Sequence, residues 1–329
     1  MKKPKVVVIG GGTGTFIVLS GLKHYPVQLS AVVTMMDSGG STGRLHDQLG
    51  VLPPGDLRQA LVALSESELI WRKLFTYRFD SGDLVGHTFG NIFLSALEKI
   101  TGSTERAINL ATTILNTKGD VIPITLETAT LCAKYIDGTA LVGEALIDSA
   151  DAARPAVNYV YLEPNVAINP KAKSKIEKAN YIIFSPGDLY TSIVPNLLVD
   201  GALDAIKNSK AQKIFFVNMM SKLGQTEGFK ASDFVREIGK YLGDVGFDYF
   251  LVNNKAPDKK LLEWYKKTAE AGIVKDDLVQ KKYPNTKIVR ADMLSKAKYE
   301  QSLSDRVKRS LIRHSPEKVA KALMGIIWK

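Results

Sequence analysis

The chain has 329 residues, of which 45% are hydrophobic and 24% are charged, and its formal net charge at pH 7 is +10. This length and composition are enough to bury a full core in one large α/β domain or two smaller ones, which excludes a disordered protein. No apolar run approaches the ~20 residues of a membrane span, and the N-terminus has no signal-peptide pattern. Because Cys132 is the single cysteine, an intrachain disulfide is excluded, and we expect a cytoplasmic protein.

The excess positive charge is divided among separate basic segments. Solvated helix faces explain such segments better than a nucleic-acid groove does, because a groove gathers basic residues on one surface. We therefore expect no nucleic-acid partner, while a homo-oligomer stays open. The segments are KNSKAQK (207–213), KAPDKK (255–260), QKKYPNTK (280–287) and VKRSLIRH (307–314).

The first element in chain order is a predicted strand, Lys5–Ile9, which runs into a glycine-rich turn. In the stretch VVVIGGGTGTF, glycines stand at positions 10, 11, 12 and 14, and apolar residues then follow at helical spacing. The pattern predicts a strand, a tight turn and a helix. Because the turn consists mostly of glycines, we expect a large group to approach its backbone. As a dinucleotide fingerprint it is incomplete, because Thr15 stands where G-x-G-x-x-G requires its third glycine. The candidate binding residues are Gly11, Gly12, Thr13 and Gly14.

The second predicted strand, Leu29–Met35, is followed by Asp37, about where dinucleotide-binding folds place a carboxylate for the ribose. A second glycine-rich loop, DSGGSTGR, begins there; it is either a ligand loop or a surface turn. Arg44 ends this loop, and its guanidinium either clamps a phosphate with two hydrogen bonds or pairs with an acid. The candidates from this loop are Asp37, Gly39, Gly40, Ser41 and Arg44.

Two further polar segments, PPGDLR and GHTFGN, supply three residues with two readings each. Asp56 either faces a ligand or caps the helix that it opens, with Arg58 as a helix residue beside it. Asn91 either contacts a base or sugar or caps its helix. We expect His87 to hold its loop by hydrogen bonds, and a general base is the less favoured alternative.

The pattern becomes β-rich between Val121 and Leu162. An Asp137-Gly138 turn lies between two apolar runs there, which is a hairpin signal. We expect a small β-rich insertion over about 121–162. Cys132 lies in one of the apolar runs, so we expect it to be buried and not a nucleophile.

The later part of the chain again alternates strand-like and helical segments. Such alternation predicts a mostly parallel, doubly wound α/β sheet. The predicted strands are Tyr181–Phe184, Lys213–Val217, Tyr249–Val252 and Lys287–Val289.

Polar loops follow the predicted strands. After YIIF comes SPGDLYTS, and after KIFFV comes NMMSKLGQT. Because the carboxyl ends of parallel strands meet at one edge of a sheet, the loops at 10–15, 37–44, 185–192 and 218–226 are expected to converge on one crevice. Small residues, hydroxyls and helix N-termini there suit a phosphate. The later loops add Pro186, Gly187, Thr191, Ser192, Asn196 and Asn218 as candidates.

Six motifs, spread from Gly10 to Phe229, carry a resemblance to a known family. They are GGGTGT, DSGGSTGRL, PPGDLR, GHTFGNIFLSAL, SPGDLYTSIVPNLLV and NMMSKLGQTEGF. In this order they closely resemble the bacterial YvcK-type gluconeogenesis factors, within the superfamily of 2-phospho-L-lactate transferase (CofD). The resemblance implies a Rossmann-like three-layer α/β/α fold with a nucleotide crevice at the strand ends. It also implies a single CofD-like domain over 1–329 that contains the β-rich subregion.

The resemblance leaves two functions open. The YvcK-type branch is associated with UDP-sugar binding, central carbon metabolism and cell-shape maintenance, which implies a regulatory protein that binds a UDP-sugar or a dinucleotide. The transferase branch moves a phospholactyl group from a guanosine diphosphate conjugate with magnesium, which implies a magnesium-dependent transferase. We favour the binder, because the sequence supplies no convincing general base.

Three departures from the family pattern limit what can be carried over. Asp37-Ser38 stands where relatives often have two aspartates, so we predict no metal site held by paired carboxylates. The usual Gly-Pro-Gly-Ser is Ser185-Pro186-Gly187-Asp188, and Met-Thr-Gln-Pro-Gly-Glu-Thr is MSKLGQT at 220–226. Asp188 would repel a diphosphate unless it points away or shares a cation.

Overall fold

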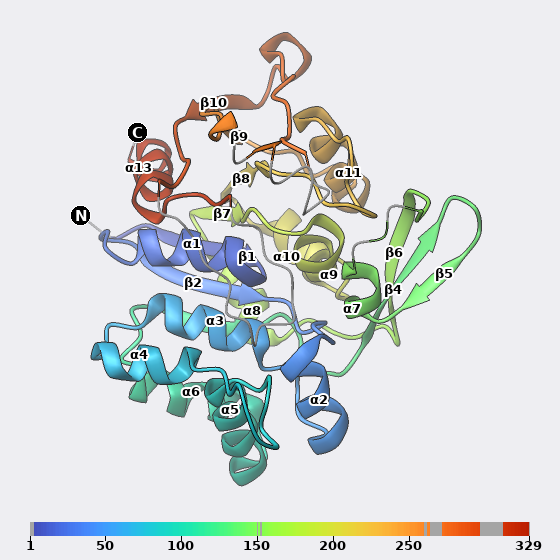
Figure 1. Cartoon of the computed structure of the whole chain (residues 1–329). Helices are drawn as coiled ribbons and strands as arrows, with labels where there is room; N and C mark the ends of the chain where they lie inside the picture. The colour runs from blue at the N-terminus through green and yellow to red at the C-terminus, as the bar shows by residue number, and fades with distance from the viewer. Residues whose placement is uncertain are drawn as a thin grey trace.

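A computed structural model describes residues 3–149, 151, 153–259, 262–263, 272–296 and 312–328. Its centre is a sheet of seven strands in the order β10-β9-β8-β7-β1-β2-β3, in which every neighbouring pair is parallel (Figure 1). The strands are β1 (Lys5–Gly10), β2 (Gln28–Val33), β3 (Asp120–Pro123), β7 (Tyr181–Phe184), β8 (Gln212–Phe216), β9 (Tyr249–Asn253) and β10 (Lys287–Ala291).

The first strand shows why this sheet is buried on both faces. Val6 and Val8 pack into one hydrophobic core, and Val7 and Ile9 pack into the other, because successive side chains of a strand point to opposite faces. Helices cover both cores and complete three layers. This Rossmann-like α/β architecture confirms the predicted fold class.

One face of the sheet is covered by helices from both ends of the chain. On this side, α1 (Gly12–Leu22), α3 (Gly55–Leu64) and α13 (Pro316–Ile327) bury residues against the core that contains Val6. A smaller helical group lies beyond α3 (Figure 1). Its members are α2 (Gly40–Leu49), α4 (Leu69–Thr76), α5 (Phe89–Thr101) and α6 (Thr104–Ile114).

The other face is covered by helices from the middle of the chain, which bury residues against the core that contains Val7. Among the described residues, no helix is both long enough and apolar enough to cross a membrane. The helices on this face are α8 (Pro170–Glu177), the π-helix η1 (Leu189–Ile193), α9 (Val194–Leu197), α10 (Ala202–Asn208) and α11 (Ala231–Leu242), and a short 3-10 turn, η2 (Gln280–Lys282), precedes β10.

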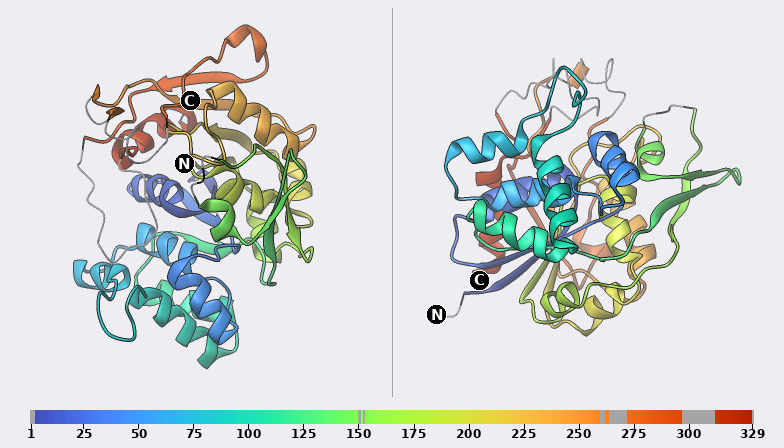
Figure 2. Two further views of the ribbon diagram at one scale, coloured as in Figure 1. Left: turned by 45° about the vertical axis from the view of Figure 1, so that its right-hand side comes forward. Right: turned by 90° about the horizontal axis from the view of Figure 1, so that it is seen from below.

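The predicted β-rich insertion is an antiparallel sheet that projects beside α9 and α11 (Figures 1 and 2). It has the order β5-β4-β6 and carries the short helix α7 (Glu144–Asp148) between β5 and β6. The first part of the expected range, about 121–162, belongs elsewhere, because β3 joins the main sheet beside β2. The strands of the insertion are β4 (Thr130–Tyr135), β5 (Ala140–Val142) and β6 (Val157–Glu163).

The predicted strands of the main sheet are confirmed, but the two basic segments that the structure describes in full do not form the faces of α-helices. Segment 207–213 leads from the end of α10 into β8, and segment 280–287 forms η2 and the turn into β10. Segments 255–260 and 307–314 lie partly outside the described residues.

Candidate functional site

Three of the predicted loops are locked together at the carboxyl edge of the main sheet. β1 and β7 are parallel neighbours, and the hydroxyls of Thr15 and Ser185, which follow them, are 2.7 Å apart. The Asn218 amide, after β8, donates to the Gly187 carbonyl at 2.6 Å and accepts from the Gly187 N–H at 3.3 Å. The loops after β1, β7 and β8 therefore form one structural unit, as their predicted convergence requires.

The glycines of the first loop make room mainly for the protein itself. A Cβ on Gly14 would overlap the Pro186 carbonyl oxygen, and one on Gly11 would overlap the Asp56 carboxylate. Gly12 differs: its φ is +62°, and the nearest neighbour of an added Cβ would be the Ser192 Oγ at 3.9 Å. Gly11 and Gly14 therefore allow close packing against Asp56 and Pro186, and of these three glycines only Gly12 has open space beside it. The expectation that all of them make room for a ligand holds at most for Gly12.

The second glycine-rich loop also has an open position. Gly40 has a φ of +46°, and an added Cβ would meet no atom within 4 Å. The Asp37 carboxylate accepts a hydrogen bond from the Gly39 N–H at 2.9 Å, and its other oxygen lies against Gly55. Gly12 and Gly40 are thus the places where these loops leave backbone open to an approaching group.

Asp56 binds the protein backbone. It lies in the first turn of α3, is 8% exposed, and accepts a hydrogen bond from the Gly12 N–H at 2.8 Å. A carboxylate at the start of α1 also interacts favourably with the dipole of that helix. Asp56 thus ties the start of α1 to α3.

Ser41 and Asn91 belong to a buried polar network behind the second loop. The Ser41 hydroxyl is 3.1 Å from the His87 Nδ1 and accepts from the Asn91 amide at 3.3 Å, and the Arg58 Nε donates to the Asn91 Oδ1 at 2.8 Å. Burial, aided by Arg44 and Arg78, lowers the pKa of His87. This network fixes α2 against α5, and His87 has the loop-holding role expected for it.

Arg44 holds a neighbouring loop. Its guanidinium donates to the Val85 carbonyl at 2.9 Å. This hydrogen bond gives Arg44 a structural role. To clamp a phosphate, the guanidinium would have to break its bond to the Val85 carbonyl and donate to the ligand.

Of the candidates after β7, Thr191, Ser192 and Asn196 lie on η1 and α9, and Pro186 and Gly187 lie in the turn before η1. The Thr191 hydroxyl donates to Asp148 at 3.1 Å, and the Asn196 amide donates to the Ser192 carbonyl at 2.9 Å. Pro186 is buried, whereas Ser192 lies on the open side of Gly12. Ser192 is therefore the residue of this group closest to the open backbone.

Lys222 is a site residue that the sequence analysis did not select. Its ammonium forms ion pairs with Asp188, at 2.8 Å, and with Asp148 on α7. The Gln225 amide also donates to Asp148, at 3.3 Å. Asp188 therefore shares a cation with Asp148. This is one of the two arrangements by which Asp188 was expected to avoid repelling a diphosphate. The signal available in the sequence was the joint departure of positions 188 and 222 from the family motifs.

The carboxylates around α7 are crowded. Burial first, and then the Asp37 and Asp148 carboxylates, raise the pKa of Glu144 well above its usual range. Burial likewise raises the pKa of Asp188, although Lys222 opposes the shift. Burial would lower the pKa of Lys222, but its two carboxylate partners outweigh it and the pKa rises. Such perturbed groups are concentrated where proteins bind or react.

The described carboxylates at this sheet edge do not form a ready metal site. Among the residues that the structure describes, no three His, Cys, Asp or Glu side chains are arranged to hold a metal ion. Ser38, which stands where relatives often have an aspartate, instead binds α7, because its Oγ accepts from the Ala145 N–H at 3.0 Å.

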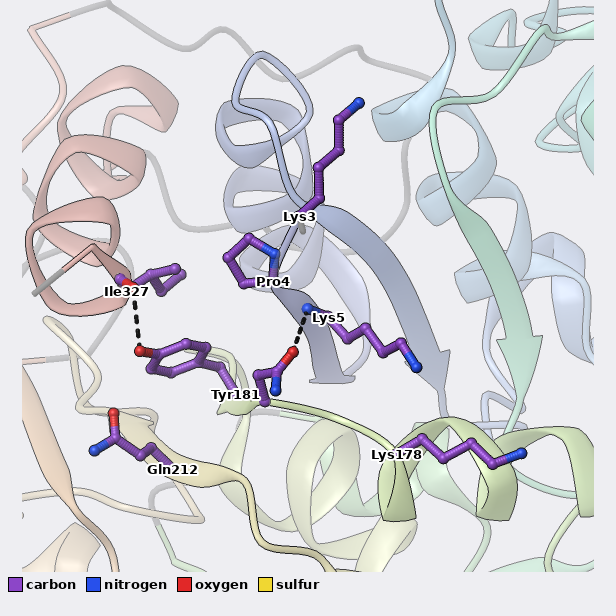
Figure 3. A pocket seen from close by; sticks show the side chains of 8 residues that line it. Lys3, Pro4, Lys5, Lys178, Tyr181, Gln212 and Ile327 are labelled. Carbon is purple, nitrogen blue, oxygen red and sulfur yellow. Dashed lines mark hydrogen bonds between the residues drawn. The ribbon is translucent and has the colours of Figure 1, made fainter. Parts of the chain in front are cut away.

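The opposite, amino edge of the sheet carries two hollows. The larger, of about 500 Å³, lies between the starts of β1, β7 and β8, and includes Lys3, Lys5 and Lys178 (Figure 3). The smaller, of about 280 Å³, includes Asp248 and Lys287. In Figure 3 the three lysine side chains do not converge on one point.

This fold and its loop-lined carboxyl edge define a Rossmann-like α/β protein, and comparisons with known proteins identify the family. The model of the family "2-phospho-L-lactate transferase CofD" matches residues 6–294, so the chain belongs to the CofD family.

Relatives and a solved structure agree with this assignment. The chain is 39% identical to the gluconeogenesis factor of Listeria monocytogenes over 327 residues, 99% of this chain and 96% of that protein. It is 41% identical to the gluconeogenesis factor of Halalkalibacterium halodurans over 277 residues, 83% of this chain and 85% of that protein. A crystal structure of a UPF0052 family protein from Bacillus halodurans is similar with a TM-score of 0.89 and 36% identity, covering 98% of this chain and 99% of that one.

Proposed function

We propose that this protein is a cytoplasmic, single-domain regulatory protein that binds a UDP-sugar at the carboxyl edge of its main sheet. Its role would lie in central carbon metabolism and cell-shape maintenance. The observation that carries the proposal is the open backbone at Gly12 and Gly40, in loops that follow β1 and β2. Helix N-termini in such loops bind phosphate through backbone N–H groups. Because the Gly12 N–H itself donates to Asp56, the donors at the start of α1 would be the N–H groups that follow it. Relatives of this chain carry the name gluconeogenesis factor.

A thermal-shift screen tests the proposal. The protein is heated with UDP, UDP-glucose, ADP-glucose and GDP, each with magnesium and with a chelator. A ligand at about 100 times its Kd stabilises the folded state by about 2.7 kcal/mol, which is a measurable rise in Tm. We expect the uridine nucleotides to give the rise with or without magnesium. No rise with any nucleotide would contradict the proposal.

A magnesium-dependent transferase is the second candidate, and the acidic side chains near α7 favour it. Glu144 has a raised pKa and lies near Asp37, so it supplies a carboxylic acid able to exchange a proton close to the open backbone. Mg²⁺ binds through one or two carboxylates together with substrate phosphates, so the metal would arrive with the substrate.

Calorimetric titration separates the two candidates. UDP-glucose and GDP are titrated into the parent and Asp37→Asn proteins, first with magnesium and then with chelator. Binding that occurs only with magnesium and is lost in Asp37→Asn would favour the transferase. Binding that is weakened by Asp37→Asn in both conditions would favour the regulatory protein.

A further inference from the structure

The cluster around Lys222 has a composition unlike that of a phosphate site. It comprises Asp148, Asp188, Lys222 and Gln225, with Glu144 at the start of the same short helix as Asp148. The two carboxylates of Asp148 and Asp188 outnumber the one ammonium of Lys222, so the cluster repels an anion. A phosphate or a second carboxylate is therefore the wrong group to place there.

A buried amide at this cluster has an acceptor without a donor. Gln225 is 5% exposed, and while its Nε2 donates to Asp148, its Oε1 accepts no hydrogen bond from the residues that the structure describes. An unpartnered buried acceptor is costly, and a donor from a bound molecule would remove that cost.

The cluster also adjoins the open backbone. Thr191, which donates to Asp148, is followed directly in the chain by Ser192, the nearest neighbour of an added Cβ at Gly12. A ligand with its phosphates at Gly12 could therefore extend its next group past Ser192 toward Asp148 and Lys222.

Sugar hydroxyls match this set of groups. A hydroxyl both donates and accepts, so it can donate to the carboxylates and to the Gln225 Oε1 while it accepts from the Lys222 ammonium. A sugar acid would bring a carboxylate against Asp148 and Asp188. We propose that Asp148, Asp188, Lys222 and Gln225 form a subsite for an uncharged sugar that rejects sugar acids. This inference rests on the proposed function.

Calorimetric titration of the parent protein with UDP, UDP-glucose and UDP-glucuronic acid tests the subsite. UDP-glucose should bind about tenfold or more tightly than UDP, which corresponds to about 1.4 kcal/mol, and UDP-glucuronic acid should bind more weakly than UDP. Equal binding of UDP and UDP-glucose would overturn the subsite while leaving nucleotide binding intact. Failure of all three ligands to bind would instead overturn the proposed function.

Two variants assign the discrimination to these residues. Asp188→Asn keeps the shape of the side chain but removes its charge, so the ratio of UDP-glucose to UDP-glucuronic acid affinity should fall about tenfold. Lys222→Met should lose the preference for UDP-glucose over UDP. Lys175→Met is the matched control, because Lys175 pairs with Asp120 at the amino edge of the sheet; its three affinities should equal those of the parent. An unchanged ratio in a folded Asp188→Asn protein would refute the assignment.

Discussion

The two edges of the main sheet differ in their glycines, their charged side chains and their hollows. The carboxyl edge has positive-φ glycines with open space, Gly12 and Gly40, beside carboxylates whose pKa values are raised. The amino edge has two hollows, of about 500 and 280 Å³, and several lysines, of which Lys3, Lys5 and Lys178 spread apart. The comparison teaches that the hollows of this fold lie away from the open glycines and the raised-pKa carboxylates on which the proposed site rests.

The largest expected effect is that of Gly14→Ala. The new methyl group would overlap the Pro186 carbonyl oxygen, so the loops after β1 and β7 could not remain together. We expect a loss of about 3 kcal/mol or more in the free energy of unfolding, measured by urea denaturation. Gly239→Ala is the control, because an added Cβ meets nothing within 4 Å in α11; it should gain about 0.5–1 kcal/mol. A Gly14→Ala protein as stable as the parent would show that the two loops separate at little cost.

Lys222→Met is the next in size and compares ion pairs at the two edges. Its loss leaves Asp148 and Asp188 without their shared cation, in side chains that are 22% and 41% exposed. Breaking a fully buried pair costs about 3–5 kcal/mol, and the partial exposure here reduces our expectation to about 2 kcal/mol. Lys175→Met, at the amino edge, should cost at most about 1 kcal/mol. Equal decreases in the free energy of unfolding for Lys222→Met and Lys175→Met, measured by urea denaturation, would contradict a difference between the ion pairs at the two edges.

Gly12→Val should separate binding from stability. A side chain at a φ of +62° costs about 1–2 kcal/mol and fills the space beside Ser192, so UDP-sugar binding should be lost in a folded protein. Gly102→Val carries the same strain, at a φ of +63° with nothing within 4 Å, at the end of α5. Calorimetry should find parental affinity in that control. Retained binding in Gly12→Val would make the first loop a structural turn only.

The smallest effect is the pH dependence of Glu144→Gln. Because the pKa of Glu144 is raised on folding, its ionised form destabilises the folded protein, and this penalty grows as pH rises through that pKa. The variant should therefore have a higher Tm than the parent at about pH 8, and the difference should shrink toward about pH 3, below the usual Glu pKa of about 4.3, where the parent side chain is protonated in both states. A Tm difference that is independent of pH would contradict the crowding of carboxylates around α7.

The strands could be predicted from sequence because their signals are local. β1 and β7 are short apolar runs bounded by polar or glycine-rich turns. A buried parallel strand has this sequence pattern whichever strand it pairs with. The sheet to which β3 belongs could not be predicted, because a four-residue strand close to a hairpin has no sequence feature that indicates its pairing partner.

The site was harder to predict because its contacts join distant segments. Whether Gly14 faces a ligand or Pro186 depends on how a loop some 170 residues later packs, which no local pattern encodes. Lys222 and Asp148 are 74 residues apart, so their pairing was equally hidden. Asn91 and Arg44 make hydrogen bonds to protein groups other than those expected of them. Asn91 binds Arg58 and Ser41 and does not cap α5, and Arg44 donates to the Val85 carbonyl.

The packing of α13 on α1 has a consequence for synthesis of the chain. Gly21 of α1 lies so close to Pro316 that a Cβ there would overlap the Pro316 carbonyl oxygen, and the helix that starts at Gly12 is thus covered by the last described helix. The strand before α1, β1, pairs with β7, which is synthesised much later. Lys5 of β1 donates its backbone N–H to Asn180, which directly precedes β7 and is 175 residues away. At about 5–20 residues per second, a ribosome would need roughly 10–35 s to supply that strand after the first one has emerged. During this interval the apolar β1 segment has neither its β7 neighbour nor its α13 cover, so β1 is enclosed long after it has been made.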